Sequence, residues 1–126
     1  MKVLGIDSAL GACSASVWDQ TVKARHQKTM SRGHVEELVP MVQRVLKDSG
    51  LTFDQLEMIA VTIGPGSFTG LRTGLAAAKG FGLALSIPVH GVTTLEAVAF
   101  AAKRERLARA KTPIIVVLET NRDDIY

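Results

Sequence analysis

The spacing of the apolar residues changes after residue 33, and this change limits the folds that the chain can adopt. Before it, three short runs rich in β-forming residues follow one another with short turns between them, at residues 2–7, 12–19 and 21–29. After it, apolar residues recur at helical spacing, at Val35, Leu38, Val39, Val42, Val45 and Leu46. The pattern predicts an antiparallel three-stranded meander followed by an amphipathic helix.

Two residues set the expected course of this helix. Gly50 follows the last periodic residue and is a natural helix stop. Pro40 lies inside the pattern and lacks the amide that would bond to the carbonyl of Glu36. We therefore expect either a kink at Pro40 or a late helix start there.

The rest of the chain alternates between strand-like and helix-like segments. Thr93 and Glu96 have the spacing of a capping box and predict a helix over residues 94–110. The other expected elements are a buried strand at 56–63, a helix from Thr69 to Leu85, a strand at 87–92 and a last buried strand at 113–119. Apart from that last strand, the order is β-β-β-α-β-α-β-α, an α/β arrangement with a mixed sheet flanked by helices. Ribonuclease-H-like domains and each half of the actin-like ATPases have this order.

Composition adds limits of its own. A chain of 126 residues with 47% hydrophobic residues fits one domain, and a net charge of +3 is no argument for a nucleic-acid partner. The single cysteine, Cys13, suits a reducing compartment. Since no uncharged run reaches the roughly 18 residues that a membrane span needs, we expect a cytoplasmic protein without membrane contact.

The sequence IGPGSFTGLRTG, at residues 63–74, joins a predicted strand to a predicted helix and invites comparison with phosphate-binding loops. A Walker loop needs lysine where Leu71 stands, and the dinucleotide fingerprint needs glycine where Thr69 stands. A serine elbow needs glycine two residues before Ser67, and Pro65 is there. The loop residues are Gly64, Pro65, Gly66, Ser67, Phe68, Thr69 and Arg72. Their position between a strand and a helix is typical of a phosphate site, but their residue types do not complete any of the three motifs.

Other candidate chemistries are also incomplete. Asp7 ends the first strand, but Thr62 stands at the end of the fourth, where a two-metal nuclease needs a second acid. His34 begins the first helix, but Leu38 occupies the place of an H-x-x-x-H partner. We therefore expect no metal site, no cofactor and a turn-forming role for Asp7.

Small residues form a stripe on the second predicted helix. Gly70, Gly74, Ala78 and Gly82 recur every four residues and share one face. Glycine inside a helix costs about 1 kcal/mol relative to alanine, so close backbone contact should compensate for it. The stripe could pack on the protein's own sheet or form a subunit interface.

A basic run follows on the last predicted helix. It comprises Lys103, Arg104, Arg106, Arg109 and Lys111, and a solvated face is its default interpretation. No aromatic residues interleave with the run, so direct RNA recognition by it is weakly supported.

Five blocks carry a family resemblance along the whole chain: VLGIDSALGACSASVWD, SRGHVEELVPMVQRVL, IGPGSFTGLRTGLAAAKGFGLAL, IPVHGVTTLEAVA and VVLETNRDDIY. They resemble the TsaB (YeaZ) family of bacterial tRNA threonylcarbamoyladenosine biosynthesis proteins, which is glycoprotease-like. The segment GPGSFTGLRTG is the most specific part of the resemblance.

The resemblance implies an actin-like fold and a non-catalytic scaffold role in adding the threonylcarbamoyl group to the adenosine beside the anticodon. The chain would pair with a catalytic TsaD-like subunit, and with itself when alone, through its first two helices. A TsaE-like ATPase would complete the complex, which would act on tRNA. The implied interface residues are Gly70, Leu71, Gly74, Ala78, Gly82, Val35 and Leu38.

Further expectations follow from the same resemblance. Asp7 and Ser8 correspond to a vestigial first phosphate loop of the actin-like superfamily. Family members are longer, so we expect residues 1–110 to form the N-terminal actin-like domain of a fragment, and 111–126 the first strand of a mostly absent second half. Two alternatives stay open: a weak nucleotide-binding, ATPase-like enzyme that uses Asp7 and the glycine loop, and a glycoprotease-like peptidase.

Overall fold

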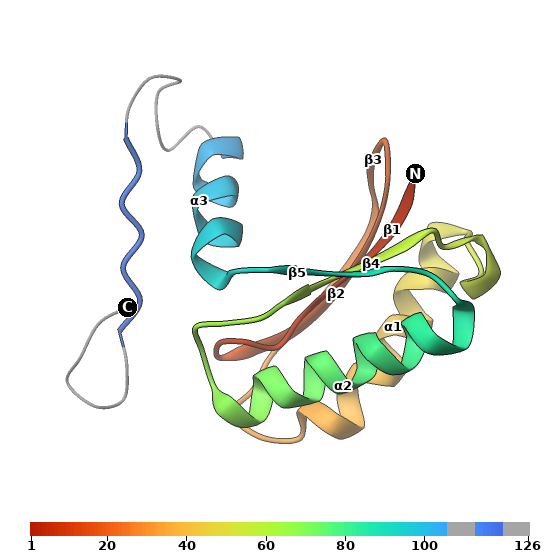
Figure 1. Cartoon of the computed structure of the whole chain (residues 1–126), viewed down its shortest axis with the longest axis horizontal. Coiled ribbons are helices and arrows are strands. Elements are labelled where there is room, and N and C mark those ends of the chain that lie inside the picture. Colours follow the sequence, from red (N-terminus) through yellow and green to blue (C-terminus); the bar gives the residue numbers. More distant parts are fainter. Residues whose placement is uncertain (106–112, 120–126) are drawn as a thin grey trace.

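A computed structural model of the chain describes residues 1–105 and 113–119, and its element order agrees with the predicted one (Figure 1). The first part of the chain is the expected meander, and strands and helices then alternate. The elements are β1 (Lys2–Asp7), β2 (Ala12–Asp19), β3 (Thr21–Thr29), α1 (His34–Ser49), the 3-10 helix η1 (Phe53–Gln55), β4 (Met58–Thr62), α2 (Phe68–Leu85), β5 (Val89–Val92) and α3 (Thr94–Arg104).

The strands form one mixed sheet in the order β3-β2-β1-β4-β5, which confirms the predicted α/β fold class. Strands β1, β2 and β3 pair antiparallel, whereas β1–β4 and β4–β5 are parallel. The parallel strands end at the same edge of the sheet, so Asp7, Thr62 and Val92 lie near one another in three neighbouring strands. The start of α2 follows this edge.

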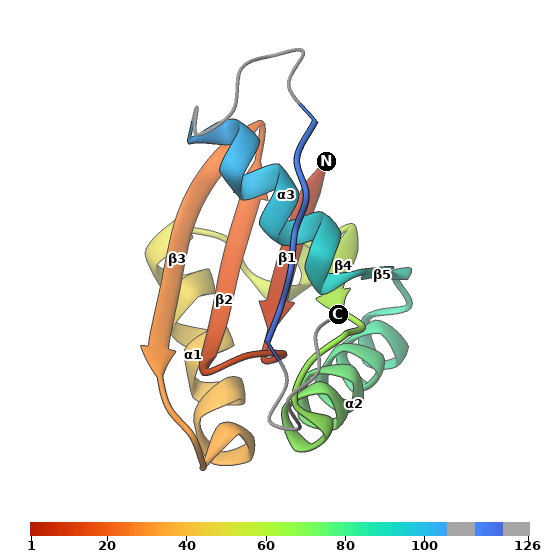
Figure 2. The ribbon, with the colours of Figure 1, turned by 90° about the vertical axis from the view of Figure 1, so that its left-hand side faces the viewer.

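Helices α1 and α2 lie side by side on one face of the sheet, and α3 lies on the opposite side (Figures 1 and 2). Alternate strand residues point toward α1 and α2, as the period of a strand requires. The fully buried core between these layers includes Leu4, Val17, Leu38, Val42 and Ile59. This packing holds α2 against the face of the sheet, with its first turn beside the end of β1.

Helix α1 spans Pro40 without a late start. It begins at His34 and ends at Ser49, and its C-cap residue Gly50 has a left-handed backbone with φ of 71°. Of the two alternatives expected at Pro40, a kink or a late helix start, the late start is therefore excluded. Buried residues on both sides of Pro40, among them Leu38 and Met41, anchor the helix to the sheet and outweigh the missing amide hydrogen bond.

The last predicted strand is not formed in the described residues. Residues 113–118 have no regular secondary structure, and the side chain of Ile115 is 87% exposed. These residues have the composition of a buried strand. A strand also needs a neighbouring strand for its backbone hydrogen bonds, and composition does not show whether one is present. The rest of the second predicted domain, and residues 106–110 of the last predicted helix, lie outside the described residues.

Within the ranges that the structure describes, no helix has both the length and the apolar character needed to cross a membrane.

Candidate functional site: the glycine loop and the outer face of α2

The turn between β1 and β2 packs directly on the first turn of α2. Ser8 and Ala9 in this turn are buried. The hydroxyl of Ser8 donates a hydrogen bond to the carbonyl oxygen of Gly70 at 2.7 Å. The amide of Ser67 donates to the carbonyl oxygen of Ala9, also at 2.7 Å. Residues far apart in the sequence are thus joined at the end of the sheet.

Three glycines permit this close approach. A Cβ atom on Gly66 would collide with the carbonyl oxygen of Ala9, and one on Gly70 with that of Ser8. A Cβ atom on Gly74 would lie 2.5 Å from the hydroxyl oxygen of Ser8. The glycines therefore let two backbones pack against each other.

The same contacts bear on the two catalytic alternatives for the glycine loop. A phosphate cradle uses several free amides at the start of a helix, and two of the amides there, those of Ser67 and Gly70, already bond within the chain. The carbonyl oxygens of Ser8 and Ala9 also face this loop and disfavour an anion. The Ser67 hydroxyl accepts from Gly70 N at 3.2 Å, so this serine is the N-cap of α2. Neither a nucleotide site nor a peptidase nucleophile is supported at this loop.

The four-residue stripe on α2 faces the protein's own sheet. Gly70, Gly74, Ala78 and Gly82 are the buried residues of the helix. Gly82, for example, lies against Val89 of β5. These residues are covered within the chain, so the stripe packs on the protein's own sheet, which is the first of the two alternatives that the sequence left open.

Three further residues were expected at the partner interface. Leu38 is only 1% exposed and belongs to the core, so its side chain packs within the chain. Leu71 is half-buried and lies close to Gly64. Val35 is 66% exposed, and it alone of the three presents most of its side chain to solvent.

A different set of residues faces outward on α1 and α2. On α2, Ala76, Gly80 and Leu83 are exposed, and Leu83 reaches 84% exposure. On α1, Val35 is joined one turn later by Val39, which is 42% exposed. We call these five residues the outer surface. Of these five, the sequence analysis named only Val35 as an interface residue. It missed the three on α2 because small residues run along two sides of this helix, and only burial shows which side is covered.

Asp7 has the turn-forming role that the sequence predicted. One oxygen of its carboxylate, Oδ1, accepts hydrogen bonds from the amide of Ala9 at 3.0 Å and from the hydroxyl of Thr62 at 2.7 Å. Thr62 thus stands where a nuclease would place its second carboxylate, and it bonds to the first one instead.

His34 begins α1 as predicted, but its side chain is buried, and its Nε2 has no hydrogen-bond partner among the described residues. One turn later Leu38 supplies no ligand. Within residues 1–105 and 113–119, no three His, Cys, Asp or Glu side chains gather in a way that could hold a metal ion. Cys13 is fully buried, and burial, followed by the charges of Asp7 and Glu37, raises the pKa of its thiol.

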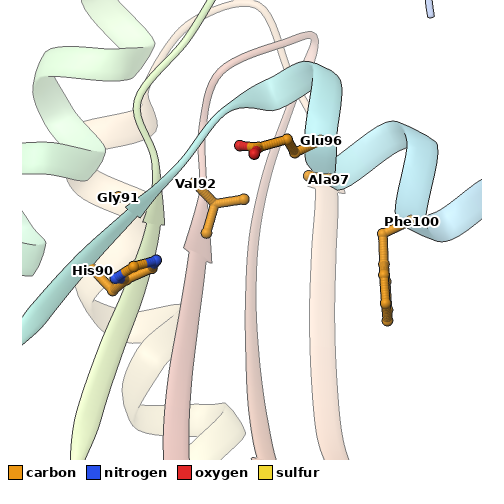
Figure 3. A pocket seen from close by; sticks show the side chains of 6 residues that line it. All are labelled: His90, Gly91, Val92, Glu96, Ala97 and Phe100. Carbon is orange, nitrogen blue, oxygen red and sulfur yellow. The ribbon is translucent and has the colours of Figure 1, made fainter. Parts of the chain in front are cut away.

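A hollow of about 380 Å³ lies between β5 and α3 (Figure 3). The sequence analysis did not predict this hollow, because its lining residues come from two elements that only the folded structure brings together. Its lining residues are His90, Gly91, Val92, Glu96, Ala97 and Phe100.

With this geometry established, comparison with known proteins identifies the family. The model of the family described as "TsaD: tRNA N6-adenosine threonylcarbamoyltransferase" matches residues 23–126. The chain belongs to this TsaD-like family. Among curated relatives, TsaB of Escherichia coli is 34% identical over 126 residues, which is 100% of this chain and 53% of the relative. TsaB of Haemophilus influenzae is 29% identical over 126 residues, or 100% of this chain and 52% of that protein.

A solved structure agrees with these matches. YeaZ from Pseudomonas aeruginosa superposes with a TM-score of 0.90 and 29% sequence identity, over 98% of this chain and 57% of that one. The predicted TsaB (YeaZ) resemblance and the actin-like, ribonuclease-H-like fold are confirmed. The chain spans about half the length of the curated relatives that it matches.

Proposed function

We propose that the chain acts in tRNA threonylcarbamoyladenosine biosynthesis as a non-catalytic scaffold that pairs with a TsaD-like catalytic subunit. Its curated relatives are named as biosynthesis proteins of this modification. In the described residues the glycine loop holds the β1–β2 turn, Ser67 caps a helix, and Leu38, which stands where an H-x-x-x-H pair would have its second histidine, is buried in the core. This distribution favours association over catalysis.

The outer surface is the proposed contact with the TsaD-like subunit. The main support for this proposal is the open space beside Gly80. A glycine inside a helix costs about 1 kcal/mol relative to alanine. At Gly70, Gly74 and Gly82 of α2, close packing within the chain explains the glycine, but a Cβ atom on Gly80 would meet nothing within 4 Å. A partner helix that approaches α2 closely at Gly80 would supply the missing reason. The exposed Leu83 would give that partner an apolar contact.

The same surface serves the other proposed associations. When no partner is present, two copies of the chain would pair through it, since α1 and α2 present the same apolar residues on each copy. A TsaE-like ATPase and tRNA would join through the assembled complex.

Co-purification of the chain with a TsaD-like subunit tests the pairing. Gly80→Arg places a long charged side chain on the outer surface, and arginine is a better helix former than glycine, so the fold should persist. We expect loss of the complex with an unchanged circular dichroism spectrum. Gly11→Arg is the matched control, because a Cβ atom on Gly11 also meets nothing within 4 Å. Equal recovery of both variants with the partner would refute the proposed contact.

A further inference from the structure

The hollow between β5 and α3 has an apolar floor and one wall made by an exposed aromatic ring. Val92 and Ala97 contribute apolar atoms to it. Phe100 is 69% exposed, so most of its ring is in contact with solvent. In Figure 3 this ring and the imidazole of His90 lie on opposite sides of the hollow. An exposed aromatic ring beside a hollow offers a surface on which a planar ring can stack.

A carboxylate stands at the rim of the hollow in a fixed position. Oε2 of Glu96 accepts hydrogen bonds from the amide of Thr93 at 3.1 Å and from its hydroxyl at 2.7 Å. These bonds lower the pKa of Glu96, first through the hydroxyl and then through the amide, so the side chain stays ionised. Within the described residues, every side-chain hydrogen bond of Glu96 ends on Oε2. Oε1 can therefore accept from a donor in the hollow, such as an amino group.

Two cations follow on the same helix. Lys103 and Arg104 lie three and four residues after Phe100, so all three share one flank of α3. Both cations are exposed, and neither forms an ion pair with another described residue. The basic run of the sequence thus does have an aromatic neighbour, one turn before it. An aromatic ring with cations beside it matches the base and the phosphate of a nucleotide.

We propose that this hollow binds one unpaired nucleotide, with its base stacked on Phe100, an amino group of the base bonded to Glu96 and its phosphate near Lys103 and Arg104. The inference rests on the proposed function and deepens it, since it identifies a surface at which the chain itself contacts RNA. Adenine, cytosine and guanine carry an exocyclic amino group that donates to a carboxylate, whereas uracil carries none. The site should therefore prefer these bases to uracil.

Titration of the chain with AMP, UMP and a short unstructured oligoadenylate, followed by amide chemical shifts, tests the proposal. We expect shifts at His90, Gly91 and Phe100 with AMP and weaker binding of UMP. Phe100→Ala should weaken binding by about fivefold to a hundredfold, because a stacked base contributes roughly 1–3 kcal/mol. Phe100→Tyr should retain it. Glu96→Gln keeps the helix cap and should reduce the preference for AMP over UMP.

Phe68→Ala is the matched control. Phe68 is 73% exposed and has Arg72 one turn later, as Phe100 has Arg104, but it lies at the start of α2 and outside the hollow. Its removal should leave AMP binding unchanged. Binding of AMP and oligoadenylate identifies an RNA residue as ligand, and binding of AMP alone identifies a free nucleotide.

Two results would overturn the inference: absence of shifts with both probes at millimolar concentration, or equal binding by wild type and Phe100→Ala. The outer surface lies on α1 and α2, on the other side of the sheet from α3. Co-purification with the TsaD-like subunit is therefore a separate readout, and failure of the nucleotide site leaves the scaffold proposal standing.

Discussion

The hydroxyl of Ser8 donates a hydrogen bond to the carbonyl oxygen of Gly70 at 2.7 Å, and the two backbones are so close that no Cβ atom fits on Gly70. This contact joins the end of β1 to the first turn of α2. This close packing explains why glycines occur in the loop. Because not every glycine of α2 is packed in this way, substitutions at different glycines should change stability differently.

Gly70→Ala should destabilise the fold. The added methyl group meets the main-chain carbonyl of Ser8, which is buried and cannot move aside without displacing the β1–β2 turn. Overpacking of this kind costs about 1–3 kcal/mol and exceeds the gain in helix propensity. We expect a net loss of about 2 kcal/mol in the free energy of unfolding, measured by urea denaturation. A variant as stable as wild type would show that the turn does not pack on α2 in this way.

Gly80→Ala should have the opposite effect. Its added methyl group meets nothing within 4 Å, so the substitution keeps all contacts and improves helix propensity. The free energy of unfolding should rise by about 0.5–1 kcal/mol. The same urea titration compares it with Gly70→Ala on one helix. A loss of stability would mean that Gly80 is already in contact, for instance with a second copy, and a dilution series would detect that dependence.

The ion pair between Lys28 and Glu37 should lower the pKa of Glu37 measured in an acid titration. Lys28 Nζ lies 2.7 Å from Glu37 Oε1. This hydrogen bond, then the charge of Lys28 and later that of Arg44, lower the pKa of the carboxyl. Because the pKa in the folded state lies below the unfolded value, the pair's contribution is present above the ordinary pKa of glutamate. It is lost as the pH falls through the lowered pKa.

Lys28→Ala should therefore raise the pKa of Glu37 toward its ordinary value, as read from the carboxyl carbon shift in an NMR titration. It should also make the free energy of unfolding less dependent on pH in the acid range. Lys79→Ala, at an exposed position on α2, is the control and should leave the titration of Glu37 in place. An unmoved pKa in Lys28→Ala would show that the pair does not persist in solution.

The thiol of Cys13 should be unreactive in the folded protein. It is fully buried in β2, and the raised pKa keeps it protonated near neutral pH. Since the thiolate is the reactive form, labelling by a disulfide reagent should require unfolding. The labelled fraction should follow the urea transition seen by circular dichroism. Rapid labelling in native buffer would indicate that β2 opens locally.

The sequence alone determined the order of the elements and most of their boundaries. The spacing of apolar residues predicted the meander and α1, and the pair Thr93 and Glu96 predicted the start of α3, where the capping box is present. These features depend on residues close together in the chain. The role of Asp7 as a turn former was predicted for the same reason.

The tertiary structure decided which face of each element is covered. Gly70 and Gly80 are both helical glycines, and their sequence context does not show that one packs on Ser8 while the other meets open space. His90 and Phe100 likewise line the same hollow only because the fold brings β5 and α3 together. No local sequence pattern specifies how these two elements are arranged. Periodicity records which residues share a face, whereas contacts between distant segments decide what that face touches.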